Sequence, residues 1–133
     1  MAELNSILLI DDDDATNFYH QTIIESANCT KHIKVCSSAS KALEYLTNTH
    51  IEGYLLPDLI FLDINMPSMN GWEFLDEYEK LHTDLKAKIM IVMLTASVNP
   101  SDNERAQQHK HVSGFVEKPL TREILKEVIS KIG

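Results

Sequence analysis

Three carboxylates, one hydroxyl and one ammonium stand at the ends of apolar stretches in this chain of 133 residues. Asp11 and Asp12 follow one stretch, Asp63 ends a second, Thr95 ends a third and Lys118 follows a fourth. Neighbouring carboxylates repel one another, and a small hard cation relieves that repulsion. An acidic pair without a full protein cage suits Mg²⁺ better than Ca²⁺, because Mg²⁺ keeps several of its waters. A lysine and a hydroxyl can hold phosphoryl oxygens, and a carboxylate can accept the phosphoryl group, so these residue types together indicate phosphoryl transfer.

The apolar stretches that carry these residues are predicted to be strands. Residues 6–10, 59–62 and 88–95 have few polar members, which is typical of strands covered on both faces of a parallel sheet. Residues 31–36 alternate between polar and apolar and should lie nearer the edge of the sheet. Residues 113–118 form a last, short strand before a proline.

Helices are predicted at residues 14–27, 41–46, 71–81, 101–110 and 121–132. In the first helix, Asp13 or Asp14 should be the cap, and Phe18, Ile23 and Ile24 are expected to face inward.

The later helices have caps and apolar sides of their own. Ser38 or Ser40 should cap the second helix, and a long connection at residues 47–57 follows it. Asn70 should begin the third helix, whose apolar side is marked by Trp72, Phe74, Leu75 and Tyr78. Asn99 and Pro100 should open the fourth, which is so polar that Ala106 is almost its only apolar residue, and we expect it to be mobile. The fifth has apolar residues at helical spacing, namely Ile124, Leu125, Val128, Ile129 and Ile132.

Strand and helix alternate five times without an internal repeat, which predicts a single domain with a parallel sheet and right-handed crossovers. The carboxyl ends of parallel strands share one edge, and ligands bind beyond that edge where the strand order reverses. We therefore expect Asp11, Asp12, Asp63, Thr95 and Lys118 to line one crevice.

The composition excludes several classes of protein. A formal charge of -8 argues against unaided binding to nucleic acid, whose backbone attracts clustered lysine and arginine. The sequence has neither a signal peptide nor a membrane span, so we expect a cytoplasmic protein. Cys29 and Cys36 lack the spacing of a zinc site and are expected to be reduced thiols, and the scattered histidines are expected to be solvated or packed.

Four motifs resemble those of the receiver domains of two-component response regulators, among which the chemotaxis regulators are similar to this chain. The motifs are Ile7-Leu8-Leu9-Ile10-Asp11-Asp12, Leu62-Asp63-Ile64-Asn65-Met66-Pro67 with Met69-Asn70-Gly71, Leu94-Thr95-Ala96, and Val116-Glu117-Lys118-Pro119. They occur in order and cover essentially the whole chain, residues 1–133. The resemblance implies a flavodoxin-like α/β fold, doubly wound, with five parallel strands in the order 2-1-3-4-5 and helices on both faces.

The resemblance also implies roles for the residues at the strand ends. Asp63 resembles the phosphoacceptor, Asp12 the direct Mg²⁺ ligand and Asp11 its water-mediated neighbour. Asn65 resembles the residue whose backbone carbonyl completes the metal site. Lys118 resembles the lysine that contacts the phosphate.

Other residues correspond to the family's switch. Thr95 resembles the switch hydroxyl, and Phe115 occupies the position of the switch aromatic, although simple core packing also accounts for it. The bond between Lys118 and Pro119 is cis in the family. Asp13 and Asp14 are then interpreted as cap and surface charge.

The function implied is that of a stand-alone receiver. It takes a phosphoryl group onto Asp63 from a sensor histidine kinase or a histidine phosphotransfer protein, later loses it by hydrolysis, and catalyses nothing else. We expect no output domain after residue 133, and we expect a natural single domain because the sequence begins with Met1 and its last predicted helix is complete. We expect the downstream partner to bind residues 101–110, 113–119 and 121–132, and the protein to be a monomer, with a dimer on phosphorylation left open.

The sequence leaves three alternative functions to be considered. The domain could be a relay intermediate that passes the phosphate onward, and the sequence names neither kinase nor pathway. A phosphatase with an aspartyl phosphate generally needs a second acid two residues after the nucleophile, where this chain has Asn65. A binding module without phosphate chemistry would not need the intact set of Asp63, Thr95 and Lys118.

Overall fold

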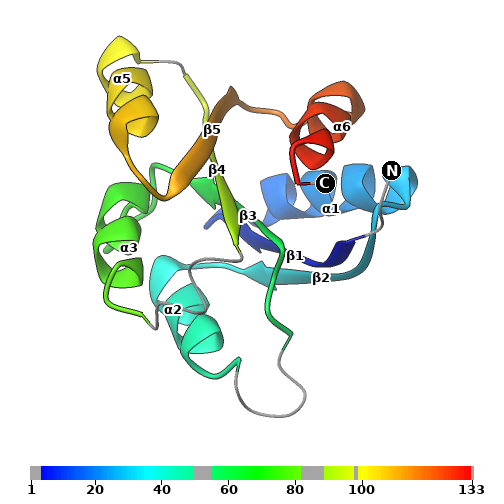
Figure 1. The fold of residues 1–133 in the computed structure, drawn as a ribbon, viewed down its shortest axis with the longest axis horizontal. Coiled ribbons are helices and arrows are strands. Elements are labelled where there is room, and N and C mark those ends of the chain that lie inside the picture. Colours follow the sequence, from blue (N-terminus) through cyan, green and yellow to red (C-terminus); the bar gives the residue numbers. More distant parts are fainter. Residues whose placement is uncertain (1–3, 50–54, 82–88, 98, 133) are drawn as a thin grey trace.

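The chain folds as a parallel sheet between two layers of helices (Figure 1). The structure, a computed structural model, describes residues 4–49, 55–81, 89–97 and 99–132. Its strands are β1 (Leu4–Ile10), β2 (Thr30–Cys36), β3 (Leu59–Asp63), β4 (Met90–Thr95) and β5 (Val112–Glu117). Its helices are α1 (Asp14–Ala27), α2 (Ala39–Thr47), α3 (Gly71–Tyr78), α5 (Pro100–Gln108) and α6 (Arg122–Ser130). The order β2-β1-β3-β4-β5, with every pair parallel, confirms the predicted doubly wound fold.

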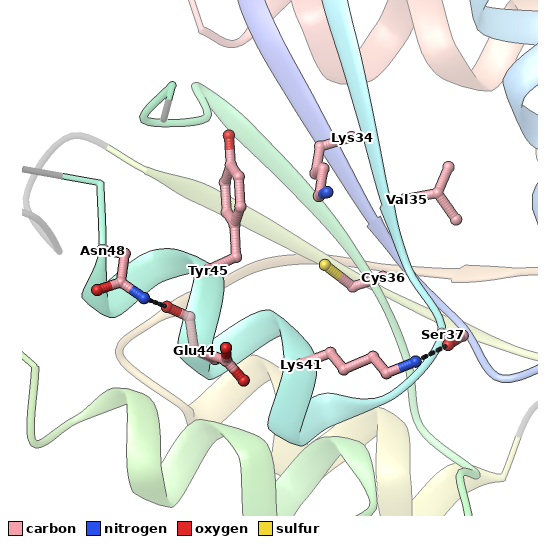
Figure 2. Close-up of a pocket in the computed structure, with 8 residues that line it drawn as sticks. All are labelled: Lys34, Val35, Cys36, Ser37, Lys41, Glu44, Tyr45 and Asn48. Carbon is pink, nitrogen blue, oxygen red and sulfur yellow. Dashed lines mark hydrogen bonds between the residues drawn. The ribbon is translucent and has the colours of Figure 1, made fainter. Parts of the chain in front are cut away.

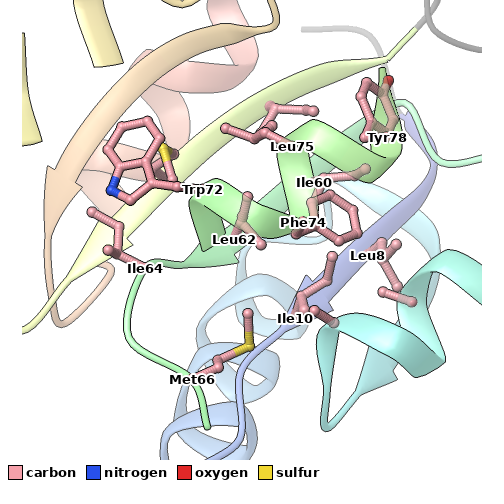
Figure 3. Close-up of a cluster of buried hydrophobic side chains, with 14 of the residues drawn as sticks. Leu8, Ile10, Ile60, Leu62, Ile64, Met66, Trp72, Phe74, Leu75 and Tyr78 are labelled. Atoms are coloured by element: carbon pink, nitrogen blue, oxygen red, sulfur yellow. The ribbon is translucent and has the colours of Figure 1, made fainter. Parts of the chain in front are cut away.

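Each face of the sheet has its own apolar core. Helices α2, α3 and α5 cover one face, and α1 and α6 cover the other (Figure 1). Successive residues of a strand point to opposite faces, so Ile60 and Leu62 of β3 pack under α3 (Figure 3) while Leu59 and Phe61 pack under α1 and α6. Burial of each such side chain contributes about 1.5–3 kcal/mol. All four residues of β3 before Asp63 are apolar and buried.

The inward side of α1 differs from the prediction. Phe18 was expected to face inward, and this is wrong, because its side chain is 73% exposed. The buried residues of α1 are Asn17, His20 and Ile24. Ile24 lies six residues after Phe18, which is about 120° around a helix, so the two cannot share one face. Ile23 is partly buried against the core, as expected.

Three helices end earlier than predicted. α3 ends at Tyr78 instead of residue 81, α5 ends at Gln108 instead of residue 110, and α6 ends at Ser130 instead of residue 132. The residue after α3, Glu79, binds Lys110 at 2.7 Å and also His111, both from the segment between α5 and β5. These hydrogen bonds, from Lys110 first and then His111, lower the pKa of Glu79 to about 2.

Four helix starts agree with the expected caps. Asp13, Ser38, Asn70 and Asn99 each accept a backbone hydrogen bond in the first turn of the helix that follows. Thr121, which was predicted to be the first residue of the last helix, is instead the cap of α6. The predicted connection at 47–57 and the predicted strand start at 88 lie partly outside the described residues. No helix among the described ranges is long and apolar enough to cross a membrane.

The two cysteines lie in different cores. Cys36 belongs to the cluster under α2 and α3, whereas Cys29 belongs to the cluster under α1 and α6. Both are buried thiols, and the sheet separates them.

Candidate functional site

The residues predicted to share a crevice do meet at the carboxyl edge of the sheet. The register pairs Ile10 with Leu62 and Asp63 with Leu94, so β1, β3 and β4 end at one level. Three of these residues are buried, namely Asp11, Asp63 and Thr95. Lys118 is partly buried and Asp12 is exposed to solvent.

Lys118 connects two of the carboxylates. Its Nζ lies 2.6 Å from Oδ2 of Asp11 and 3.0 Å from Oδ1 of Asp63. Burial disfavours the charge of Lys118, but hydrogen bonds from its ammonium to Asp11 and Asp63 outweigh that effect and raise its pKa. The lysine is therefore a fixed cation between two carboxylates.

Asp63 is held in a way that leaves one oxygen available. Oδ1 accepts from Lys118 and from the backbone N–H of Asn65, the latter at 3.4 Å. Within the part of the chain that the structure describes, Oδ2 accepts no hydrogen bond. Burial raises the pKa of Asp63, the bond from Lys118 opposes that shift, and repulsion from Asp11 adds to it.

Asp11 is positioned by the start of α1. Its Oδ1 accepts from the backbone N–H of Asp13 at 3.0 Å, and its carbonyl accepts from the buried side-chain amide of Asn17 at 2.8 Å. Sequence reasoning missed Asn17. Its spacing of three from His20 and seven from Ile24 places these residues on one helical stripe, and that signal was available.

The acidic cluster fits a small divalent cation. Asp11, Asp12 and Asp63 each offer one oxygen, and these atoms lie within 4.8 Å of one another. The donors are all hard oxygens, and Asp12 faces solvent, so waters can complete a coordination shell. This chemistry suits Mg²⁺ and not zinc, which favours histidine and cysteine.

Gly71 sets the distance between α3 and the end of β3. A Cβ atom on this residue would lie 2.8 Å from the carbonyl oxygen of Asp63 and 3.0 Å from Cα of Ile64. The N–H of Gly71 also donates to the carbonyl of Ile64 at 2.8 Å. The sequence indicated Gly71 only as a residue of the turn, and the close approach depends on packing.

Among the described residues, the Thr95 hydroxyl forms hydrogen bonds with Ser97 and none with Asp63. Its hydroxyl donates to the carbonyl of Ser97 at 2.8 Å and accepts from the N–H of Ser97 at 3.3 Å. Its own carbonyl accepts from the N–H of Lys118 at 2.7 Å, which joins the ends of β4 and β5. The single proton of the Thr95 hydroxyl is therefore donated to the carbonyl of Ser97.

Phe115 and the segment after β5 complete the surroundings. Phe115 is partly buried against the core under α2 and α3, and it lines a cavity of about 380 Å³ between α5 and β5. The peptide bond between Lys118 and Pro119 is cis, as the resemblance implied. His20 is buried and accepts from the N–H of Leu120 at 3.2 Å, and burial lowers its pKa.

Comparison with known proteins agrees with this geometry. Residues 7–130 match the family described as the response regulator receiver domain. The chain is 30% identical over 126 residues to the probable methanogenesis regulatory protein FilR2 of Methanothrix harundinacea, covering 95% of this chain and 79% of that protein. It is 29% identical over 127 residues to the response regulator Rcp1 of Synechocystis, covering 95% and 84%. It spans 53% of the response regulator Rre1 of the same organism, at 29% identity.

Solved structures of response regulators also resemble this chain. The two component response regulator from Cytophaga hutchinsonii matches with a TM-score of 0.91 at 35% identity, covering 98% of this chain and 97% of that one. A response regulator receiver protein from Dyadobacter fermentans matches with a TM-score of 0.84 at 27% identity, covering 96% of each chain. The chain therefore belongs to the response regulator receiver domain family of two-component signalling.

Proposed function

We propose that the chain accepts a phosphoryl group on Asp63 from a phosphorylated histidine of a kinase or phosphotransfer protein. The observation that carries this proposal is the position of Lys118, whose ammonium contacts both Asp11 and Asp63 at the edge of the sheet. A cation in contact with a buried carboxylate is what a phosphoryl acceptor needs, because transfer depends mainly on alignment and charge neutralisation.

The transfer uses the available oxygen of Asp63. Oδ2 forms the new bond to phosphorus while the bond between phosphorus and the donor's imidazole nitrogen breaks, and that nitrogen keeps the electron pair. Lys118 and the Thr95 hydroxyl donate to the phosphoryl oxygens. Asp11, Asp12, Asp63 and the carbonyl of Asn65 would hold Mg²⁺, which would supply further neutralisation of the negative charge when bound. Hydrolysis of the acyl phosphate returns the carboxylate.

The donor is proposed to approach over α1. A groove of about 420 Å³ lies beside Lys118 and is lined in part by Tyr19 and Ala96. The side chains of Phe18 and Tyr19 are 73% and 47% exposed on the same helix. Exposed aromatic side chains beside a reactive group are typical of a protein contact.

The output is proposed to pass through α5. Once phosphorylated, Asp63 draws the Thr95 hydroxyl away from Ser97, and Phe115 turns inward into the space that is vacated. Only Ala106 of α5 is buried, so this helix can shift at low cost, and the face formed by α5, β5 and α6 then binds a downstream partner. The unphosphorylated protein already adopts this active conformation part of the time, and phosphorylation increases the fraction of molecules that adopt it.

We propose that residues 1–133 act as one receiver domain in the cytoplasm and as a monomer before phosphorylation. The domain catalyses only its own phosphorylation and dephosphorylation.

Labelling with a small phosphodonor tests the acceptor. Incubation with acetyl phosphate and Mg²⁺, followed by intact mass measurement, should add one phosphoryl group to the wild type. Asp63→Asn should gain none. Asp14→Asn, an exposed acid in the first turn of α1, is the matched control and should label like the wild type. Equal labelling of Asp63→Asn would refute the proposed acceptor.

A further inference from the structure

The outer edge of the sheet carries a groove that the phosphoryl chemistry does not use. The groove has a volume of about 480 Å³ and lies between β2 and α2 (Figure 2). In the described part of the chain, β2 pairs with β1 alone. The other edge of β2 presents backbone N–H and C=O groups that another strand can pair with.

This edge groove is locally positive on an acidic protein. The whole chain has a net charge of -8, but residues 30–48 contain three lysines and one glutamate. Lys34 of β2 and Lys41 of α2 line the groove, and neither forms an ion pair with a described carboxylate. The only acidic residue lining it is Glu44, within the described residues. The groove therefore attracts anionic groups.

The walls of the groove are held in place. The hydroxyl of Tyr45 donates to the carbonyl of Leu55 at 2.7 Å and accepts from the N–H of Leu55 at 3.0 Å. The ammonium of Lys34 lies 5.4 Å from the centre of the Tyr45 ring, a cation–π contact. Lys41 Nζ lies 3.4 Å from Oγ of Ser37, at the end of β2. Pre-ordered side chains lose less entropy when they bind a ligand.

Two residues of β2 that line the groove have the side-chain spacing of an extended peptide. Lys34 and Cys36 are two residues apart in β2 and point to the α2 face, and the charges of Lys34 and Lys41 both act on the buried Cys36 thiol. A strand paired with β2 would lie about 4.8 Å away, with side chains beside Lys34 and Cys36 that are also two residues apart. Carboxylates at those two positions would reach Lys34 and Lys41.

The opposite face of the same edge favours apolar residues. Ile33 and Val35 are partly buried against the core under α1 and α6. We propose that β2 accepts a strand of a partner protein in which acidic and apolar residues alternate, with its carboxylates on Lys34 and Lys41. The added strand would place its apolar side chains beside Ile33 and Val35.

Lysine on an edge strand also discourages pairing with apolar strands, so the charge of Lys34 alone could protect β2 from aggregation. Protection from aggregation and binding of an acidic strand make different predictions. Protection predicts no binding by any strand, whereas the proposed site selects an acidic one.

A pair of short peptides separates these roles. One alternates aspartate and valine over eight residues, and the other has lysine in place of aspartate. Fluorescence anisotropy at low salt should show binding of the aspartate peptide only, and backbone amide shifts should concentrate in β2. Lys34→Glu and Lys41→Glu should each weaken binding about tenfold, because repulsion replaces attraction. Glu44→Gln should strengthen it.

Lys126→Glu is the control, since it makes the same charge change at an exposed position of α6 and should leave the affinity unchanged. Equal binding of both peptides, or no binding of either, would overturn the proposal. An equal loss of affinity for the aspartate peptide in Lys126→Glu and Lys34→Glu would also overturn it. Binding of inorganic phosphate that depends on Lys34 and Lys41, without amide shifts along β2, would do the same. Self-association of the chain through β2 in place of peptide binding would also overturn it.

Discussion

A Cβ atom on Gly71 would lie 2.8 Å from the carbonyl oxygen of Asp63, so the first residue of α3 is packed against the end of β3. Both the clashing oxygen and the nearby Cα of Ile64 belong to the backbone and cannot rotate away. The close packing of α3 against the end of β3 therefore helps to determine the position of the Asp63 carboxylate.

Gly71→Ala should lower the free energy of unfolding by about 1–3 kcal/mol, because the added methyl group forces the backbone at the end of β3 to shift. Urea unfolding measures this. Gly114→Ala is the control, since the atoms nearest to its Cβ would be side-chain atoms of Val92 at 3.4 Å or more, and it should cost less than about 1 kcal/mol. Equal costs for the two variants would contradict the role assigned to Gly71.

Mg²⁺ should raise the melting temperature of the wild type, because it relieves repulsion among Asp11, Asp12 and Asp63. Asp12→Ala should abolish this rise. Asp13→Ala removes the cap of α1 and should cost about 1 kcal/mol of stability, but it should retain the response to Mg²⁺. Differential scanning fluorimetry with and without Mg²⁺ distinguishes the two acids, and an unchanged response in Asp12→Ala would show that the metal lies elsewhere.

The pH dependence of stability should reveal the buried carboxyl group of Asp63. Burial raises the pKa of Asp63 above its usual 3.8, so the folded state holds this proton more tightly than the unfolded state. Stability from this group is present at low pH and is lost as pH rises from 3.8 through the raised pKa. The stability of Asp63→Asn relative to the wild type should therefore grow with pH over this range in urea unfolding. A difference that is constant, or that shrinks, would contradict the raised pKa.

Trp72, the one tryptophan, should report the movement of α5. Its Nε1 donates to Asp102 at 3.3 Å, and the Arg105 guanidinium lies 4.4 Å from the ring centre. Beryllium fluoride with Mg²⁺, a phosphoryl mimic, should change the fluorescence of the wild type. Thr95→Ala should bind the mimic but show a much smaller change, because α5 no longer follows. An equal change of fluorescence in Thr95→Ala would show that the Thr95 hydroxyl does not couple Asp63 to α5.

The strands and the site residues were predictable because their signals are local. β3 and β4 are buried on both faces, so their sequences are nearly continuous apolar runs, and Asp63 and Thr95 mark their ends. The helix starts were predictable for the same reason, since a cap such as Asp13 bonds within its own first turn.

The remaining features depend on contacts between distant residues. α3 ends next to Glu79, whose partners Lys110 and His111 follow more than 30 residues later. The inward stripe of α1 includes the polar residues Asn17 and His20, because Asp11 and Leu120 supply their hydrogen-bond partners. A reading based on apolar spacing placed Phe18 there instead.

The most direct test locates the phosphoryl group in the chain. After phosphorylation with acetyl phosphate and Mg²⁺, borohydride reduction converts an aspartyl phosphate to homoserine, and peptide mass spectrometry finds its position. Homoserine is expected at position 63 alone. Homoserine at position 11 or 12, or a gain of phosphate with unmodified Asp63, would contradict the proposal that Asp63 accepts the phosphoryl group.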